Sequence, residues 1–473
     1  MATDLTKGSP LKQILYFSIP YLIGNLFQQF YNLADMVIVG RTISPEAYAA
    51  VGSTGSIVTL TIGSISAMSV GFSTVIARHV GANDKDTIKR SFASAIKLSA
   101  VIALLLTALC LYFLRPMLEL LRTPPDIIDR SQNYLFWLFA GIVFTTLYNL
   151  LANVIRALGD SKTPLYFLIV ACVVNIILDF VLIAVLGMDT DGAGLATVIA
   201  QLVAGICCIV YIRKRMPALH ISRCHFARNG VQGRELLRLG IPQIFLNAVV
   251  SVGSIMVQFV TNGLGTDFVS AQATGGKIEA IVILPIVSIG SSVTVFTAQN
   301  FGAKKYDRVL AGGKAAMLLG LIFCTIASLI MIPFGKGIVT LLMGKEVEMS
   351  VILNAYRYVV VHTALSMILV ILIVFKDVLL AAGRTFWTMV SGFTEIAGRV
   401  GVSFAAMFII NAAIVTDQEG FFFMCFTNAA AWLLGTLTVV LDYAFLMRKL
   451  RRMSDEQTAK NVEAEAEIPA PIS

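Results

Sequence analysis

The stretch ILYFSIPYLIGNLFQQFYNLADMVIV, residues 14–39, is apolar over a length that can cross a lipid bilayer, for which a helix needs roughly 20 residues. It also carries a carboxylate, Asp35, in the last fifth of its length. A charge at that depth usually faces protein or a water-filled cavity and marks an ion or substrate path. A second carboxylate, Asp179, lies in a similar apolar run with Asn175 one helical turn before it. These three residues are therefore predicted to form a buried cation or proton site.

The composition indicates a polytopic all-α membrane protein. Hydrophobic residues make up 57% of the 473 residues and charged residues 14%, against about 25% charged in an ordinary soluble domain. The first twelve residues are polar and the first apolar run is too long for a signal peptide, so none is expected. The net charge of +8 is assigned to the loops, where Lys and Arg set membrane orientation, and no nucleic-acid partner is expected.

No catalytic centre is visible in the sequence. Six of the seven cysteines lie in apolar segments and none has zinc-site spacing, so they are interpreted as free thiols in the core. Metalloprotease, serine-hydrolase and phosphate-loop motifs are missing. The chain is therefore not expected to be an enzyme or to hold a cofactor, and any pumping must draw on an ion gradient.

Twelve apolar segments follow one another along the chain. Their approximate spans are 14–40, 47–72, 91–114, 132–158, 163–187, 192–213, 235–262, 268–297, 308–333, 351–382, 386–411 and 420–447. The connections after alternate segments, such as 78–90 and 213–238, are rich in Lys and Arg, whereas those at 189–191 and 417–419 are acidic. Because basic loops stay in the cytoplasm, both termini are predicted to be cytoplasmic.

The chain also repeats itself at a spacing of 220 to 228 residues. The aligned stretches are SIPYLIGN (18–25) with GIPQIFLN (240–247), ARHVGAND (77–84) with AQNFGAKK (298–305), NVIRALGDSKT (153–163) with DVLLAAGRTFW (377–387), and DTDGAG (189–194) with DQEGFF (417–422). Each repeat holds six segments, an even number, so the halves should be related by an axis along the membrane normal, with the substrate cavity between them.

This arrangement predicts two pseudo-symmetric six-helix lobes. The N-terminal lobe is assigned to 1–213 and the C-terminal lobe to 235–448. Residues 214–234 are the expected cytoplasmic linker. The tail, 449–473, turns polar and acidic and is expected to be disordered.

At this point the sequence resembles the multidrug and toxic compound extrusion (MATE) family over essentially its whole length. The resemblance rests on the IP near the start of each half, the GA pair after segments 2 and 8, RALGDSKTP in segment 4 and NIILD in segment 5. It implies a V-shaped bundle that alternates between outward and inward openings. It also implies a monomer in the bacterial inner membrane that exchanges organic, often cationic, compounds for Na⁺ or H⁺.

The family's cation site maps onto five residues of this chain. Asp35 matches the helix-1 aspartate, Asn175 and Asp179 the helix-5 pair, and Ala193 (through its carbonyl) and Thr197 the helix-6 positions. Such an all-oxygen set suits a hard cation, with Asp35 and Asp179 as the charged ligands if the ion is Na⁺. Without a metal ion, two carboxylates in a low dielectric would share a proton. The alternative is that each Asp caps a broken helix or pairs with a base, but no Lys or Arg is near either in sequence.

The C-terminal half carries its own intramembrane charges. By the repeat, Glu395 and Arg399 occupy the places of Asn175 and Asp179, and their i,i+4 spacing predicts a structural ion pair. Three further residues are candidates for the wall of the substrate cavity. These are Asn153, Glu279 and Asp377.

Two other classes of function compete with an ion-coupled exporter. A lipid-linked oligosaccharide or cell-wall precursor flippase uses a related two-lobe bundle, but often has fourteen spans and a basic central cavity. A channel or receptor is disfavoured by the two-half repeat and the lack of a pore-loop signature.

Overall fold

The computed structural model describes residues 3–121, 123–226, 230–344, 346–412 and 414–466, with side chains up to residue 459. The first half contains α1 (Pro10–Thr42), α2 (Pro45–Ser53), α3 (Gly55–Gly81), α4 (Lys85–Tyr112), α5 (Leu114–Leu120), α6 (Ile128–Ala140), α7 (Ile142–Ala157), α8 (Lys162–Asp179), the π-helical turn η1 (Phe180–Val185) and α9 (Thr190–Arg215). Two short 3-10 turns, η2 (Pro217–Leu219) and η3 (Arg223–Phe226), lead into the second half. That half contains α10 (Gly230–Asn262), α11 (Thr266–Gly302), α12 (Tyr306–Met343), α13 (Met349–Ala381), α14 (Phe386–Asn411), α15 (Asp417–Met424) and α16 (Thr427–Ala466).

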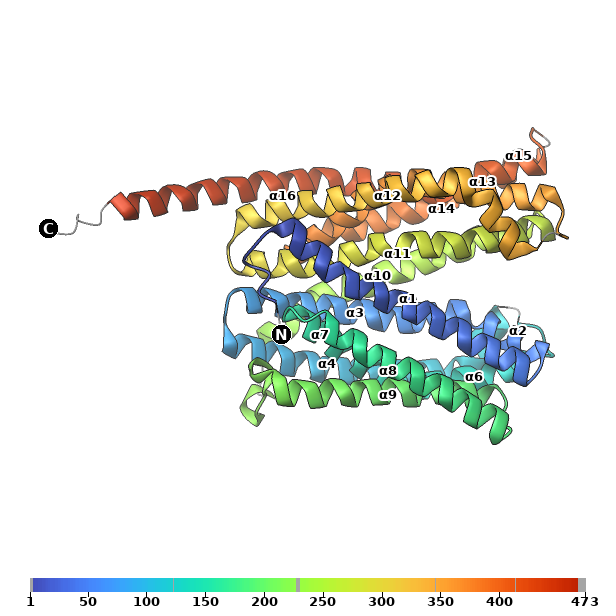
Figure 1. Cartoon of the computed structure of the whole chain (residues 1–473), viewed down its shortest axis with the longest axis horizontal. Coiled ribbons are helices and arrows are strands. Elements are labelled where there is room, and N and C mark those ends of the chain that lie inside the picture. Colours follow the sequence, from blue (N-terminus) through green and yellow to red (C-terminus); the bar gives the residue numbers. More distant parts are fainter. Residues whose placement is uncertain (1–2, 122, 227–229, 345, 413, 467–473) are drawn as a thin grey trace.

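The helices form two bundles that lie side by side, with both termini at the same end of the molecule (Figure 1). The N-terminal lobe holds α2 to α9 and the C-terminal lobe α11 to α16, while the first helix of each half crosses to the other lobe. α1 packs on α8 of its own lobe and on α11 and α12 of the other, and α10 packs on α3 as well as on α14. The two crossings are equivalent in the sequence repeat, so the internal symmetry predicted from the repeat is present in the fold.

The described part of the chain contains ten helices that are long and apolar enough to cross a membrane, or eleven if α6 and α7, bent by 50°, form one span. The one expected segment left over is the first in the chain, α1, which has 33 residues but is not among these helices. Its middle carries several amide side chains beside Asp35, namely Asn25, Gln28, Gln29 and Asn32, and these lower its hydropathy. The chain is thus a multi-pass all-α membrane protein.

Three features depart from the predicted spans. The second segment is divided at Thr54 into α2 and α3, and α3 continues to Gly81. The fifth ends as an α-helix at Asp179 and continues as a π-helical turn. The tail is not disordered as far as it is described, because α16 runs on to Ala466. Residues 448–466 are rich in Arg, Lys, Glu and Ala, all good helix formers, and contain no Gly or Pro.

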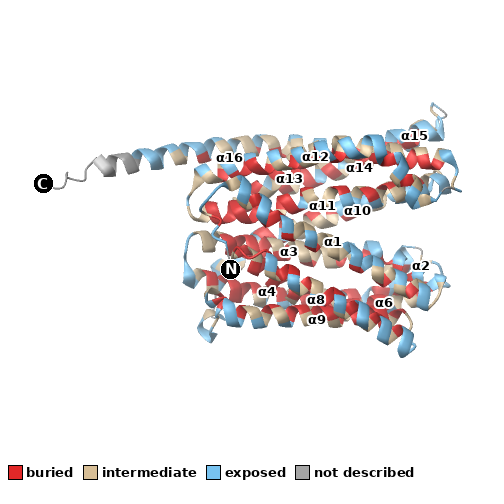
Figure 2. Ribbon diagram, in the orientation of Figure 1, coloured by how far each residue is buried: buried red, intermediate tan, exposed pale blue. Residues whose placement is uncertain are grey.

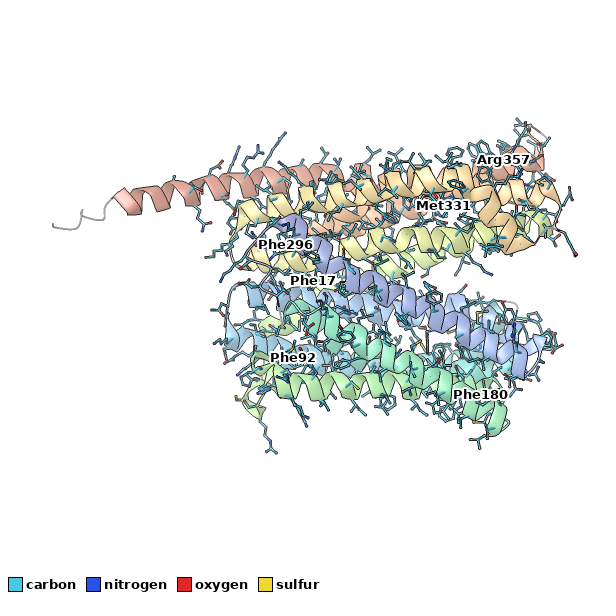
Figure 3. All side chains as sticks on the ribbon, viewed as in Figure 1. Phe17, Phe92, Phe180, Phe296, Met331 and Arg357 are labelled. Carbon is cyan, nitrogen blue, oxygen red and sulfur yellow. The ribbon has the colours of Figure 1, made fainter. Side chains whose placement is uncertain are left out.

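Each lobe has its own apolar interior, seen in Figure 2 as buried faces turned inward and exposed faces turned outward. Phe92 is buried in the N-terminal lobe, while Phe296 and Phe17 belong to one cluster in the C-terminal lobe, where α1 crosses onto α11 (Figure 3). Phe180, at the opposite end from the termini, is exposed. Outward-facing apolar side chains of this kind suit contact with lipid.

The two lobes touch closely at the end where the termini lie. A Cβ atom on Gly81 would lie 1.8 Å from the carbonyl oxygen of Gln299, and one on Gly302 would lie 1.9 Å from that of Arg78. Only glycine permits such an approach of two helix backbones. Gly81 and Gly302 are equivalent in the repeat, so the same contact is made twice across the interface.

Side chains reinforce this contact. Arg78 Nε donates to the carbonyl oxygen of Ala381 (2.7 Å), and Gln299 Nε2 donates to that of Ala157 (2.8 Å). Arg78 and Gln299 are again repeat equivalents, and each satisfies a carbonyl at the C-terminus of a helix in the opposite lobe. The end of the molecule near the termini is therefore closed.

Candidate functional site

Asp35 and Asp179 come together inside the N-terminal lobe. Asp35 lies on α1 and is 4% exposed, and Asp179 is the last residue of α8 and is 0% exposed. Their carboxyl groups lie within hydrogen-bonding reach of each other. In the part of the chain that the structure describes, neither forms an ion pair with Lys, Arg or His within 4.0 Å.

Asn175 links this pair to α9. Asn175 Nδ2 donates to Asp179 Oδ2 (3.1 Å), and Asn175 Oδ1 accepts from the backbone N–H of Thr197 (3.3 Å), in the amide orientation that satisfies both neighbours. Ala193 is fully buried on the same helix, one turn before Thr197. All five predicted residues thus lie on three helices that pack together, α1, α8 and α9.

Two tyrosines, which the sequence did not point to, complete the site. Tyr134 of α6 donates its hydroxyl hydrogen to Asp35 Oδ2 (3.2 Å). Tyr31 lies one turn before Asp35 on α1, and its hydroxyl lies beside that of Thr197. Helical spacing from Asp35 could have identified Tyr31, because i and i−4 share a face. No local pattern points to Tyr134, which reaches Asp35 only through the packing of α6.

Several oxygens of the site lack a hydrogen-bond partner of normal geometry among the described residues. They are the Tyr31 hydroxyl, Asp35 Oδ1, Asp179 Oδ1 and Thr197 Oγ1. Buried polar atoms are normally paired, so a cluster of such oxygens without a base suits a bound cation or proton. The turn that follows, η1, has the wider π-helical winding that often occurs at functional sites.

A cavity of about 780 Å³ lies between the lobes, walled mainly by the C-terminal one. It adjoins a second space of about 1270 Å³, since four residues line both: Asn247, Val250, Ser254 and Gln258. The second space is also lined by residues at the α2 and α15 end, including Gly52 and Asp417. The cavity therefore extends toward the end of the molecule opposite to the closed one.

Glu279 lies on the cavity wall within a hydrogen-bonded network. Its Oε2 accepts from the hydroxyl of Tyr358 (2.8 Å) and its Oε1 from Asn428 Nδ2 (3.1 Å). Asn428 Oδ1 in turn accepts from Arg399 Nε (3.2 Å), and its Nδ2 lies 3.2 Å from His362 Nε2. A carboxylate, an arginine and their connecting amide therefore share one wall.

The predicted pairing of Glu395 with Arg399 is wrong. Glu395 Oε1 instead accepts from Lys376 Nζ (2.8 Å) and from the hydroxyl of Ser391 (3.1 Å), while Arg399 binds Asn428. The i,i+4 spacing does place Glu395 and Arg399 on one face of α14. Lys376 reaches that face from α13, and a tertiary contact of this kind cannot be read from spacing.

Of the other two candidates for the cavity wall, Asp377 lines the 780 Å³ cavity and Asn153 does not line either of the two spaces. Asn153 is buried in α7, where its Oδ1 accepts from Arg156 Nη1 (3.2 Å). Asn153 is therefore better explained as a partner of that arginine.

Known proteins resemble this chain in both sequence and fold. YpnP, a probable multidrug resistance protein of Bacillus subtilis (strain 168), is 32% identical over 292 residues, which are 60% of this chain and 63% of that protein. MepA, a multidrug export protein of Staphylococcus aureus (strain NCTC 8325 / PS 47), is 24% identical over 253 residues, 53% of this chain and 56% of MepA. The match to this chain thus spans less than two thirds of the length of either relative.

Solved structures share the fold over nearly the whole chain. A crystal structure of a MATE protein in the bent conformation has a TM-score of 0.85 at 20% identity, covering 95% of this chain and 100% of that one. The outward-facing conformation of a multidrug resistance MATE family transporter also has a TM-score of 0.85, at 21% identity over 94% and 99% of the two chains. The sequence model of the MatE family matches residues 20–181 and 242–407, one block in each half. Members of this family are transporters and not enzymes, and the chain belongs to it.

Proposed function

We propose that this protein is an antiporter that exports small organic compounds, often cationic ones, in exchange for Na⁺ or H⁺. The observation that carries the proposal is the buried pair of Asp35 and Asp179, which no base among the described residues neutralises. Two carboxyl groups in contact can hold a shared proton, or both can be ionised around a cation. The names of the relatives, a probable multidrug resistance protein and multidrug export proteins, support export as the direction.

In this mechanism the ion and the substrate occupy different lobes. Asp35, Asn175, Asp179 and Thr197, with the carbonyl of Ala193, bind the ion, and the cavity beside Glu279 takes the substrate. Ion binding shifts the balance between the outward-open and inward-open states only to the extent that the ion binds one state more tightly than the other. Binding and release of the coupling ion, either a proton or Na⁺, thereby drive the lobes between the outward-open and inward-open states. Each chain has its own site and cavity, so a monomer suffices.

We further propose that both termini lie in the cytoplasm of a bacterial cell and that the structure is outward-open. The closed end carries the termini, and the space lined by Gly52 and Asp417 then opens to the outside. Reporters fused after Ser473 or inserted within 220–230 should report cytoplasm, and one inserted at 189–191 should report the exterior. A cytoplasmic signal at 190 would overturn this orientation.

Ethidium efflux in cells or vesicles, with Na⁺ and pH varied independently, tests the function directly. Wild-type protein should lower intracellular ethidium only when one of the two ion gradients is present. Efflux that persists when the Na⁺ gradient and the pH gradient are both absent would contradict ion coupling. No dye transport, together with transport of a lipid-linked oligosaccharide, would favour the flippase class instead.

A further inference from the structure

The wall of the 780 Å³ cavity carries two cations as well as three carboxylates. Lys376 is neutralised by Glu395, to which it donates at 2.8 Å. Arg399 is different, because it forms no ion pair within 4.0 Å with any described acidic residue. Its Nε donates to Asn428, and its Nη1 is buried without a partner among the described residues. The side chain nonetheless lines the cavity, and the residue is only 5% exposed.

The carboxylates near Arg399 are already engaged by other donors. Glu279 accepts from Tyr358 and Asn428 through its two oxygens. Both Glu279 and Glu395 act on the Arg399 guanidinium through space, without touching it. A buried guanidinium with an unpaired N–H is unfavourable, and its planar donors match a carboxylate.

The Arg399 side chain packs closely against the neighbouring helix, α10. At Gly253 of α10, a Cβ atom would lie 2.8 Å from Arg399 Cδ and 3.2 Å from its Nη1. Any larger residue at position 253 would press on the Arg399 side chain and displace its guanidinium. Tyr358 and Trp432 line the same cavity and supply aromatic surface.

We propose that Arg399 binds a carboxylate of the transported compound and thereby sets the preference of the cavity between compounds that carry a carboxylate and those that do not. Asp377, on the same cavity, receives the cationic end. This inference rests on the proposed function and names a residue of its cavity that recognises substrate charge. It assigns to Arg399 the role of a group that selects substrates, in place of the structural role predicted from the sequence.

A matched pair of dyes tests the assignment: a rhodamine with a free carboxylate, which is zwitterionic, and its methyl ester, which is a cation. Fluorescence anisotropy on purified full-length protein gives the dissociation constant of each. Arg399→Gln should weaken binding of the free acid by about tenfold or more, as expected for a lost charged hydrogen bond. Binding of the ester should stay within about twofold. Arg399→Lys keeps the charge but not the fork of donors, so it should give an intermediate loss.

Arg357→Gln is the matched control. Arg357 lies on α13 in the same lobe (Figure 3). It is not among the residues that line the cavity, so both dyes should bind as to wild type. Equal effects of Arg399→Gln on the two dyes, or none on the acid, would overturn the inference. Should Arg399→Gln fail to fold, Gly253→Ala gives a second route, with the same selective loss expected. If wild type pumps the ester but does not bind the acid, only this inference fails; if it pumps neither, the proposed function fails.

A second inference comes from the segment before α1, residues 3–9, here called the strap. On one side the backbone N–H of Thr3 donates to the carbonyl oxygen of Gly159 (2.9 Å), at the turn between α7 and α8. Gly159 has φ +95°, and a Cβ atom there would lie 2.1 Å from the Thr3 carbonyl oxygen. The strap is therefore seated closely on the N-terminal lobe.

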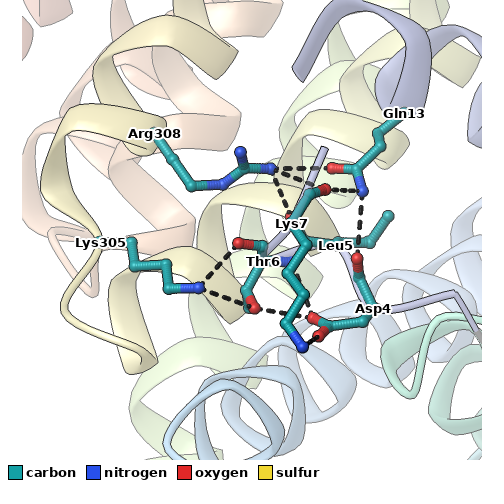
Figure 4. A network of polar contacts seen from close by, with 7 residues as sticks. All are labelled: Asp4, Leu5, Thr6, Lys7, Gln13, Lys305 and Arg308. Carbon is teal, nitrogen blue, oxygen red and sulfur yellow. Dashed lines mark hydrogen bonds and ion pairs between the residues drawn. The ribbon is translucent and has the colours of Figure 1, made fainter. Parts of the chain in front are cut away.

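On its other side the strap is held by Lys305, in the turn between α11 and α12, and by Arg308, in the first turn of α12 (Figure 4). Lys305 Nζ donates to the carbonyl oxygen of Thr6 (2.9 Å) and Arg308 Nη2 to that of Leu5 (3.1 Å). Gln13 Oε1 accepts from Arg308 as well (3.0 Å). Positive side chains of the C-terminal lobe thus hold backbone carbonyls of the strap.

We infer that the strap is a latch for the closed end. It joins the α7–α8 turn of one lobe to the α11–α12 turn of the other, beside the contact of Gly81 with Gln299. The lobes cannot separate at this end while both attachments persist. Opening must therefore release the strap from one lobe, and weakening the strap must favour the inward-open state.

Hydrogen–deuterium exchange on the intact protein tests the latch. Arg308→Gln removes donors to the strap, and it should raise the exchange rate of amides in the last turns of α3 and α11 by several-fold, with α2 and α15 unchanged. The control is Lys12→Gln, at an exposed position of α1, which should change neither end. Unaltered exchange at the closed end, or an equal rise along all helices, would overturn the latch.

Discussion

The two lobes use the same repeat position for opposite electrostatic purposes. Asn175 and Asp179 of α8 correspond, 220 residues later, to Glu395 and Arg399 of α14. In the N-terminal lobe the carboxylate of Asp179 lies beside the carboxylate of Asp35 and the side-chain amide of Asn175. In the C-terminal lobe Glu395 meets Lys376, and Arg399 meets Asn428.

This difference indicates which lobe can exchange an ion. A buried acid with a fixed base is neutralised within the protein, and losing either partner leaves an uncompensated charge. A buried acid without a base needs a mobile cation or proton to compensate it. The N-terminal lobe is thus suited to ion coupling and the C-terminal lobe to recognising substrate charge.

The comparison is tested most severely by Asp35→Asn, which keeps the shape of the side chain and removes its charge. We expect a correctly inserted protein that still binds dye in detergent but has lost its ion-dependent efflux down to the background of transporter-free vesicles. Asp179→Asn should behave in the same way, since the two carboxyl groups act as a pair.

Asp377→Asn is the matched control in the other lobe, because it also removes a carboxylate within the membrane-spanning bundle. It should change dye affinity and leave the Na⁺ and pH dependence of efflux in place. If Asp35→Asn exports as well as wild type at several pH and Na⁺ values, the assignment of the ion to the N-terminal lobe is wrong. Coupling would then have to be sought at Asp377 or Glu279.

The next largest effect is expected on stability, in the C-terminal lobe. Lys376→Gln leaves Glu395 buried without its base, which should destabilise the fold by about 3 kcal/mol. The double variant Lys376→Gln with Glu395→Gln should recover most of that loss, as measured by thermal unfolding in detergent. Asp179→Asn should destabilise far less, because it leaves no buried base without a partner. Equal losses of stability for Lys376→Gln and Asp179→Asn would remove the distinction between the lobes.

The sequence was informative where a signal is local or repeated. The apolar segments, the internal repeat and the isolated carboxylates at 35 and 179 are properties of single stretches, so the two-lobe fold and the acidic pair could be predicted from them. The helical tail was mispredicted because its acidity was weighed above the helix propensity of residues 448–466. The break at Thr54 falls in the run GSTG, residues 52–55, a local helix-breaking signal that the predicted span did not use, whereas the π-helical turn after Asp179 has no comparable signal.

Partners contributed by other helices could not be predicted. Tyr134 reaches Asp35 from α6, and Lys376 reaches Glu395 from α13, at sequence separations of 99 and 19 residues. The i,i+4 rule describes neighbours on one helix, and it therefore assigned Glu395 to Arg399. In a bundle, the choice between a same-helix and a cross-helix partner depends on side-chain reach and helix packing, which spacing does not contain.

A smaller effect is expected at Tyr134, which donates a hydrogen bond to Asp35. Tyr134→Phe removes the donor and keeps the ring, so the ionised form of Asp35 loses about 1.5 to 3 kcal/mol of stabilisation. The Na⁺ concentration for half-maximal efflux should rise by roughly tenfold or more. Tyr358→Phe, which removes the corresponding donor to Glu279, should leave that concentration unchanged; an equal rise in both variants would argue against an ion site confined to one lobe.

The smallest effect is expected at Thr197, a neutral member of the site. Its Oγ1 lacks a hydrogen-bond partner among the described residues, while its backbone N–H holds Asn175 in place. Thr197→Ala keeps the backbone contact and removes one oxygen, so it should weaken ion binding by roughly 0.5 to 1.5 kcal/mol, or about two- to tenfold. Thr197→Ser restores the hydroxyl and should recover most of the wild-type Na⁺ dependence. Isothermal titration with Na⁺ distinguishes the variants, and if Ala and Ser behave alike, Thr197 acts through packing and is not a ligand of the ion.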